Sequence, residues 1–161
     1  MAIITLSGRI ALAAALKAKP LHIAWGTGNP AWDNTPVQEQ PSDSALVAEV
    51  GRRTILIAQY CTPDDASGSI EIPGGRFSPA SVKTNYLYIR ATFEFEDASS
   101  SEIREVAIFS DTEVISGLPA GQMYFTPTQI ASPGLLLALE RFPSINRSPS
   151  VRQSFDFVLN I

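Results

Sequence analysis

The sequence predicts an α+β protein that is mostly antiparallel β-sheet or sandwich, with a short N-terminal helix. Three observations predict it. Residues 5–18 carry apolar side chains at helical spacing, whereas residues 84–97 and 151–161 alternate between apolar and polar side chains, as strands with one buried face do. A chain of 161 residues suits a single domain, 1–161, in which a helix at 5–19 precedes a β-rich body at 21–161.

The N-terminal segment "TLSGRIALAAALKAKP" is typical of a helix at both of its ends. Thr5 or Ser7 can cap the start, and Pro20 ends the helix because proline has no backbone N–H to donate. Leu6 and Ile10 share one apolar face with alanines, the strongest helix formers. The apolar run is too short to span a membrane. Although Arg9 precedes it, residues 1–8 are apolar rather than basic and no separate cleavage site follows, so we expect a retained helix in a protein made in the cytoplasm.

The middle of the chain predicts short elements between loops. "LHIAW" (21–25) predicts a strand that enters a proline-containing loop at 26–42. "SDSALVAEVG" (42–51) predicts a brief helix, and "RRTILIAQYC" (52–61) predicts one strand. A further strand is expected around Ile70 and Ile72, within a turn-rich segment.

The clearest strands lie in the second half. The long alternating strand at 84–97 is followed by the turn "SSSE" and by "IREVAIFSD" (103–111), which together predict an antiparallel pair. "GLLLALERF" (134–142) and "VRQSFDFVLNI" (151–161) predict two more strands, and Phe155 and Phe157 lie on the apolar face of the last one. Its alternation reaches the final residue, so pairing with a neighbouring chain is conceivable.

Composition excludes several classes of protein. The net charge is −4 and no basic run occurs, so the concentrated basic face of a nucleic-acid-binding protein is missing. The single cysteine, Cys61, cannot form an internal disulfide and is expected to be a small buried residue. Charged residues make up only 17% of the chain, which fits a surface covered by partners and equally a β-rich domain with many Ser and Thr.

No set of residues predicts an active site. Gly26, Gly28 and Ala31 match the spacing of a dinucleotide-binding loop, but the prolines that follow cannot open the long helix which that loop requires. His22 has no nucleophile or acid near it in a recognisable motif. Glu94 and Glu96 are best explained as a solvated strand face. We therefore expect no catalytic residues, no cofactor and no metal, and the protein is predicted not to be an enzyme.

The two tryptophans of the opening loop have different expected roles. Trp25 ends a strand and is predicted to be buried. Trp32 lies in the middle of the loop, where it can anchor a protein interface or, with Tyr86 and Tyr88, form a shelf for stacking sugars. The glycines and prolines of "WGTGNPAWDNTP" predict a stiff bend.

Several pieces in this order resemble structural modules of bacteriophage tails, especially tail-fibre N-terminal, tail-collar-like or baseplate-attachment modules. They are "TLSGRIALAAALKAKP", "LHIAWGTGNPAWD" and "SDSALVAEVGRR", followed by the strands "YLYIRATFEFED" and "EIREVAIFSD". The resemblance covers about residues 5–110. One departure is Ala107, which stands where such modules usually have glycine.

The resemblance implies a non-enzymatic virion structural protein that connects baseplate or tail to tail fibres through protein–protein interfaces. Its partners would be other tail, baseplate or fibre proteins and further copies of itself, in a virion tail assembled from protein made in the host cytoplasm. The alternatives are a carbohydrate-binding receptor-recognition module and a neck or tail-completion protein. The candidate interface residues are Leu6, Ile10, Trp32, Phe155 and Phe157.

Overall fold

A computed structural model describes residues 1–161, which form two compact units. Unit 1 consists of Met1–Lys19, Ile55–Ala91 and Ser154–Ile161, and unit 2 consists of Pro20–Thr54 and Thr92–Gln153. The elements are mostly antiparallel strands with one α-helix, which confirms the predicted fold class. The single domain expected from chain length stays a prediction.

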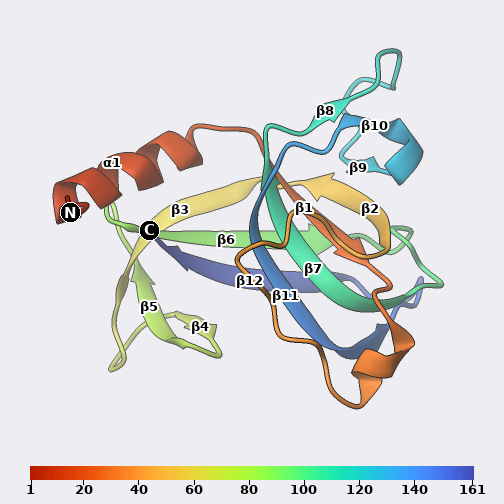
Figure 1. The fold of residues 1–161 in the computed structure, drawn as a ribbon, viewed down its shortest axis with the longest axis horizontal. Helices are drawn as coiled ribbons and strands as arrows, with labels where there is room; N and C mark the ends of the chain where they lie inside the picture. Colours follow the sequence, from red (N-terminus) through yellow and green to blue (C-terminus); the bar gives the residue numbers. More distant parts are fainter. The chain divides into compact units, whose positions relative to one another are not determined.

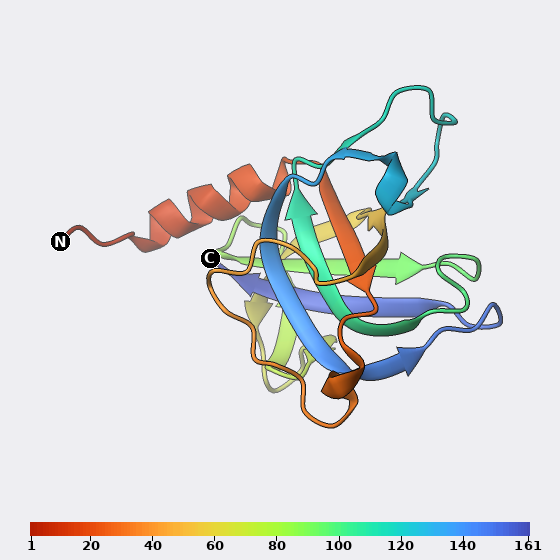
Figure 2. The ribbon, with the colours of Figure 1, turned by 45° about the vertical axis from the view of Figure 1, so that its right-hand side comes forward.

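Unit 1 holds the N-terminal helix and a five-stranded antiparallel sheet in the order β12-β6-β3-β5-β4. Its elements are α1 (Leu6–Lys17), β3 (Ile57–Pro63), β4 (Ile70–Ile72), β5 (Gly75–Pro79), β6 (Tyr86–Phe93) and β12 (Gln153–Asn160). In Figures 1 and 2, β12, β6 and β3 run side by side. A small core forms around the fully buried Cys61, which packs with Ile70, Phe77 and Tyr88.

Unit 2 holds a second five-stranded sheet in the order β11-β7-β1-β2-β9, and the two-stranded ribbon β10-β8. Its elements are β1 (Leu21–Gly26), η1 (Pro30–Asp33), β2 (Glu49–Thr54), β7 (Glu102–Ser110), β8 (Glu113–Val114), β9 (Tyr124–Phe125), η2 (Pro127–Gln129), β10 (Ile130–Ser132) and β11 (Leu135–Asn146). Every residue of β1 is buried, and β1 lies between β7 and β2 in the sheet.

The core of unit 2 confirms the predicted burial of Trp25. The Trp25 ring is inaccessible and stacks on Phe93, with ring centroids 3.5 Å apart. Its indole N–H donates to the Tyr124 hydroxyl (3.3 Å), and the Arg147 guanidinium lies 5.0 Å from its ring. Ala107 is buried in a regular part of β7 opposite Ala24, so alanine in place of glycine does not disturb the strand.

The strand pairing differs from the expected hairpin. The strands at 84–97 and 103–111 were predicted to pair, but β6 belongs to the sheet of unit 1 and β7 to that of unit 2. β7 pairs instead with β1 (Trp25 opposite Val106) and with β11 (Leu139 opposite Ala107). A turn of suitable length permits a hairpin, but it does not decide which strand finally covers each edge.

Three further elements differ from their predictions. The predicted helix at 42–51 is wrong, because the N–H groups of Val47 and Ala48 donate to the buried Glu105 carboxylate (3.1 and 2.9 Å) and the chain enters β2 in extended form. The single strand predicted at 52–61 is two strands, β2 and β3, in different sheets. β6 ends at Phe93, since Asp97 accepts from the Glu94 N–H (2.7 Å) and closes a turn.

Candidate protein–protein interface

Helix α1 begins and ends as the sequence predicts. The Thr5 side chain accepts a hydrogen bond from the Gly8 N–H (3.2 Å), which satisfies one of the free donors of the first turn. Lys17 occupies the last turn, and its ammonium lies 5.6 Å from the centroid of the Tyr60 ring. Along the helix, the Arg9 guanidinium donates to the Ile161 carbonyl (3.1 Å).

The helix is held mainly at its C-terminal half. Ala13 is its single buried residue, and Ile10 and Leu16 are half-buried. In Figure 2 the N-terminal end of α1 stands clear of the strands of unit 1. An isolated helix of this length is marginal in water, so α1 depends on contacts with its own unit, and its buried residue lies in the C-terminal half.

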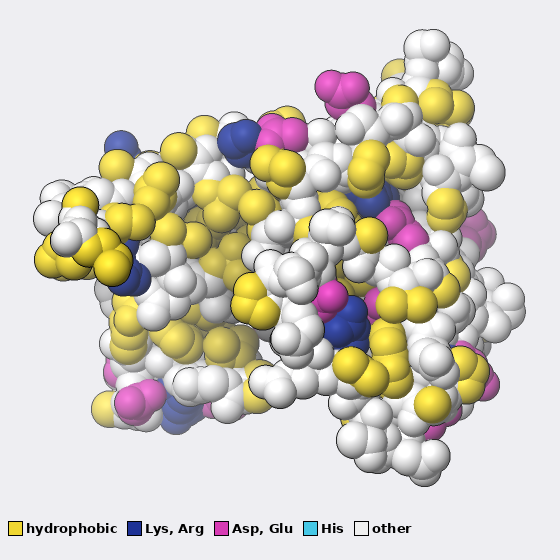
Figure 3. Space-filling view, viewed as in Figure 1, with side chains coloured by type: hydrophobic (Ala, Val, Ile, Leu, Met, Phe, Trp, Pro, Cys, Tyr) yellow, Lys and Arg dark blue, Asp and Glu magenta, His cyan; other side chains and the backbone are white.

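Large apolar side chains are exposed along α1 and the segment before it. These are Met1, Ile3 (86% exposed), Ile4 (60%), Leu6 (63%) and Leu12 (48%). Figure 3 shows hydrophobic side chains gathered over α1. Contiguous exposed apolar surface on a protein commonly marks a site of contact with another protein or a membrane. We call Met1–Leu12 the apolar arm.

The other predicted interface residues lie elsewhere. Phe155 and Phe157 are half-buried in β12, at the edge of the unit 1 sheet. Trp32 was expected at the surface and is instead 5% exposed in η1. The Arg141 guanidinium lies 5.2 Å from the Trp32 ring centroid, and η1 packs along β11. Its aromatic face is thus used within unit 2.

The loop that carries Trp32 is a bend, as predicted. Gly28 has a φ of +56°, and a Cβ there would lie 2.4 Å from the Trp32 ring, so both backbone and packing require glycine. The buried Arg104 donates two bonds of 2.8 Å to the Asp33 carboxylate. These bonds hold the pKa of Asp33 well below its usual range. The loop is therefore fixed at its short helical turn.

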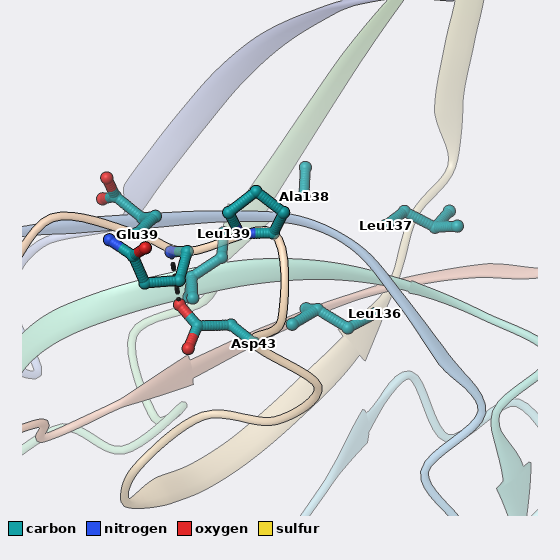
Figure 4. A pocket seen from close by; sticks show the side chains of 8 residues that line it. Glu39, Asp43, Leu136, Leu137, Ala138 and Leu139 are labelled. Carbon is teal, nitrogen blue, oxygen red and sulfur yellow. Dashed lines mark hydrogen bonds between the residues drawn. The ribbon is translucent and has the colours of Figure 1, made fainter.

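A cavity of about 300 Å³ lies between residues 39–43 of this loop and residues 136–139 of β11. Figure 4 shows Leu136 and Leu139 beside Asp43, with the Leu137 side chain pointing away from it. Both carboxylates are already engaged. Glu39 accepts from the Arg141 N–H (2.6 Å), and Asp43 accepts from the Gln40 N–H (2.9 Å) and pairs with the Arg141 guanidinium (3.0 Å). Because these bonds fix the loop at a distance from β11, the cavity is explained as a space left between the loop and the strand.

The side chains that the sequence analysis weighed as catalytic or metal-binding candidates are buried or bonded to neighbouring residues. Burial lowers the pKa of His22 from 6.5 to about 4, and its Nε2 lies 3.3 Å from the Thr54 hydroxyl. Burial raises the pKa of the Cys61 thiol to about 11. Glu94 lies in the turn after β6 and pairs with Arg152 (2.5 Å). The structure contains no cluster of three or more His, Cys, Asp or Glu side chains that could hold a metal. No helix is long and apolar enough to cross a membrane.

Comparison with known proteins agrees with the tail resemblance. No curated protein matches the chain. One family model matches it over residues 1–161, and its description is "baseplate wedge 3 tail fiber network component". This match over the whole chain confirms the resemblance to phage tail modules, and the chain belongs to this family.

Proposed function

We propose that the chain is a non-enzymatic connector that joins the baseplate or tail to tail fibres, and that the apolar arm docks on a neighbouring tail protein. As a member of its family it is a structural component of a phage baseplate and tail-fibre network. The observation that carries the proposal is a helix with exposed leucine side chains and one buried residue, preceded by the exposed Ile3 and Ile4.

Docking would bury the apolar side chains of the arm that its own unit leaves exposed. Burying a leucine or isoleucine side chain contributes about 1.5 to 3 kcal/mol when it passes from full exposure to full burial. The arm offers several such side chains at once, on the helix and on the segment before it, and the first turn of the helix is already capped. An amphipathic helix laid into an apolar groove is a common mode of protein recognition. The chain would work in the virion tail after synthesis in the host cytoplasm, in several copies around the tail axis.

The receptor-binding alternative loses its structural basis. It required Trp32, Tyr86 and Tyr88 on an open shelf. Trp32 and Tyr88 are both 5% exposed, and the Tyr88 hydroxyl donates to Asp156 (2.5 Å). A sugar ring stacks on an accessible aromatic face, which neither residue offers.

Capture with purified proteins tests the connector. The wild-type chain, Leu6→Asp and Leu56→Asp are each immobilised and mixed with purified baseplate and fibre proteins of the same phage. Leu56 is the matched control, because it is also in unit 1 and is 80% exposed in the connection between β2 and β3. We expect capture by wild type and Leu56→Asp and none by Leu6→Asp. Equal capture by all three variants, or no capture by wild type, would refute docking through the arm.

A further inference from the structure

The two charged side chains of α1 lie on the side of the helix that faces its own unit. Arg9 and Lys17 are four residues before and after the buried Ala13, so the three side chains share one face. The Arg9 guanidinium donates to the Ile161 carbonyl, and the Lys17 ammonium lies over the Tyr60 ring. Both charges are therefore directed toward unit 1 and not toward the open side of the helix.

The opposite side of α1 carries no charge. Ala11 and Ala15 are each two residues from the buried position, and at about 100° per residue this places them on the far side of the helix. Both are exposed, as is the neighbouring Leu12 (48%). The Ile4 side chain lies beside Gly8, since a Cβ at Gly8 would lie 3.2 Å from the Ile4 Cγ2 atom. We call the outer face the set Ile4, Gly8, Ala11, Leu12 and Ala15.

A helix at a protein surface normally has the reverse arrangement, with apolar side chains toward the core and charged side chains toward water. Lys, Glu, Arg and Asp are almost never fully buried unless they are paired. In α1 the two charges are used for contacts with unit 1, and the side open to water has only alanine, glycine, leucine and isoleucine. This pattern indicates that another apolar surface covers the outer face.

We propose that the tail protein that receives the apolar arm also covers the outer face, in an apolar groove without charged side chains. This inference rests on the proposed function, because it requires the arm to dock. Leu6 is seven residues before Ala13 and therefore lies on the inner side of the helix. A groove that buries both Leu6 and Leu12 encloses the arm. At about 1.5 Å per residue, the 12 residues of α1 need a groove about 18 Å long.

The position of the charges favours a protein over a lipid surface as the partner. Helices that lie on membranes carry Lys and Arg on the polar side, where these side chains meet anionic lipids while the apolar side enters the bilayer. Arg9 and Lys17 instead contact unit 1, so they are engaged by the chain itself. A groove in a second protein asks for no cations beside the outer face.

A charge placed on the outer face tests the groove. Ala11 is exposed and glutamate is a good helix former, so Ala11→Glu should fold with an unchanged circular dichroism spectrum. An unpaired charge in an apolar groove is strongly unfavourable, so Kd for the captured tail protein should rise by at least about a hundredfold. Ala66→Glu is the matched control, because Ala66 is exposed in unit 1 between β3 and β4. Its Kd should stay within about twofold of wild type.

Cysteine labelling gives a second measurement with a smaller change of side chain. Ala11→Cys should react with a maleimide in the free chain and be protected when the partner is bound, whereas Ala66→Cys should react equally in both states. Native Cys61 is fully buried and adds no background. Labelling of Ala11→Cys that the partner does not slow would overturn the inference even if Ala11→Glu fails to fold.

Leu6→Asp separates this inference from the proposed function. If Leu6→Asp abolishes capture and Ala11→Glu binds as wild type does, the arm docks but the outer face stays in water, and only this inference is wrong. If the wild-type chain captures no tail protein, both are wrong. An equal loss for Ala11→Glu and Ala66→Glu would also overturn the inference. So would wild-type chain that sediments with phosphatidylcholine–phosphatidylglycerol vesicles when Ala11→Glu does not, since a lipid surface would then cover the outer face.

Discussion

Substitution of Leu6 in the apolar arm is expected to weaken partner binding by a predictable amount. Leu6→Ala removes the equivalent of about three methylene groups, each contributing about 0.8 kcal/mol when buried. Leu6 is 63% exposed in the free chain, so only that share can be gained on docking. The expected loss is about 1.5 kcal/mol, or about tenfold in Kd.

Adding Ile4→Ala should weaken binding to about a hundredfold in Kd relative to wild type, because Ile4 is 60% exposed and its side chain loses a similar volume. The assay is a binding titration of each variant against the tail protein that the wild-type chain captures. Alanine is the best helix former, so α1 is not weakened by the change at Leu6. Leu56→Ala should leave Kd unchanged. A Kd within twofold of wild type for the double variant, or an equal loss for Leu56→Ala, would refute the energetic role of the arm.

Three further predictions concern unit 2 and are checked by urea unfolding. His22 is protonated near pH 6.5 in the unfolded chain and only near pH 4 in the folded chain. The free energy of unfolding should therefore be highest above about pH 6.5 and fall by up to about 3 kcal/mol toward pH 4. His22→Gln should remove this part of the pH dependence. Gly51→Ala should cost about 1 to 3 kcal/mol, since its Cβ would lie 2.0 Å from the Tyr124 hydroxyl oxygen, and an unchanged midpoint would contradict the packing. Glu105→Ala should cost about 2 to 4 kcal/mol, because it strands the N–H groups of residues 47 and 48; a loss below about 0.5 kcal/mol would show that water replaces the carboxylate.

The sequence by itself determined the features that depend on neighbouring residues. The capped helix after Thr5 and the strands containing Ile89, Val106 and Phe157 follow from spacing and alternation over a few residues, and the structure has all of them. The bend at Gly28 was also readable, because a tight loop needs a residue that tolerates positive φ. The order of pieces that resembles phage tail modules belongs with these features, since it too is a property of the linear chain.

Tertiary structure decided what depends on residues far apart in the chain. β7 pairs with β1 and β11, which are distant in sequence, because burying both of its faces outweighs the local turn after β6. Glu105 draws residues 47 and 48 out of a helix. Trp32 is buried because Arg141 and β11 reach it from more than a hundred residues away. The place of β12 at the end of its sheet likewise exists only once the sheet has formed, because alternation predicts a strand but not which strands lie beside it.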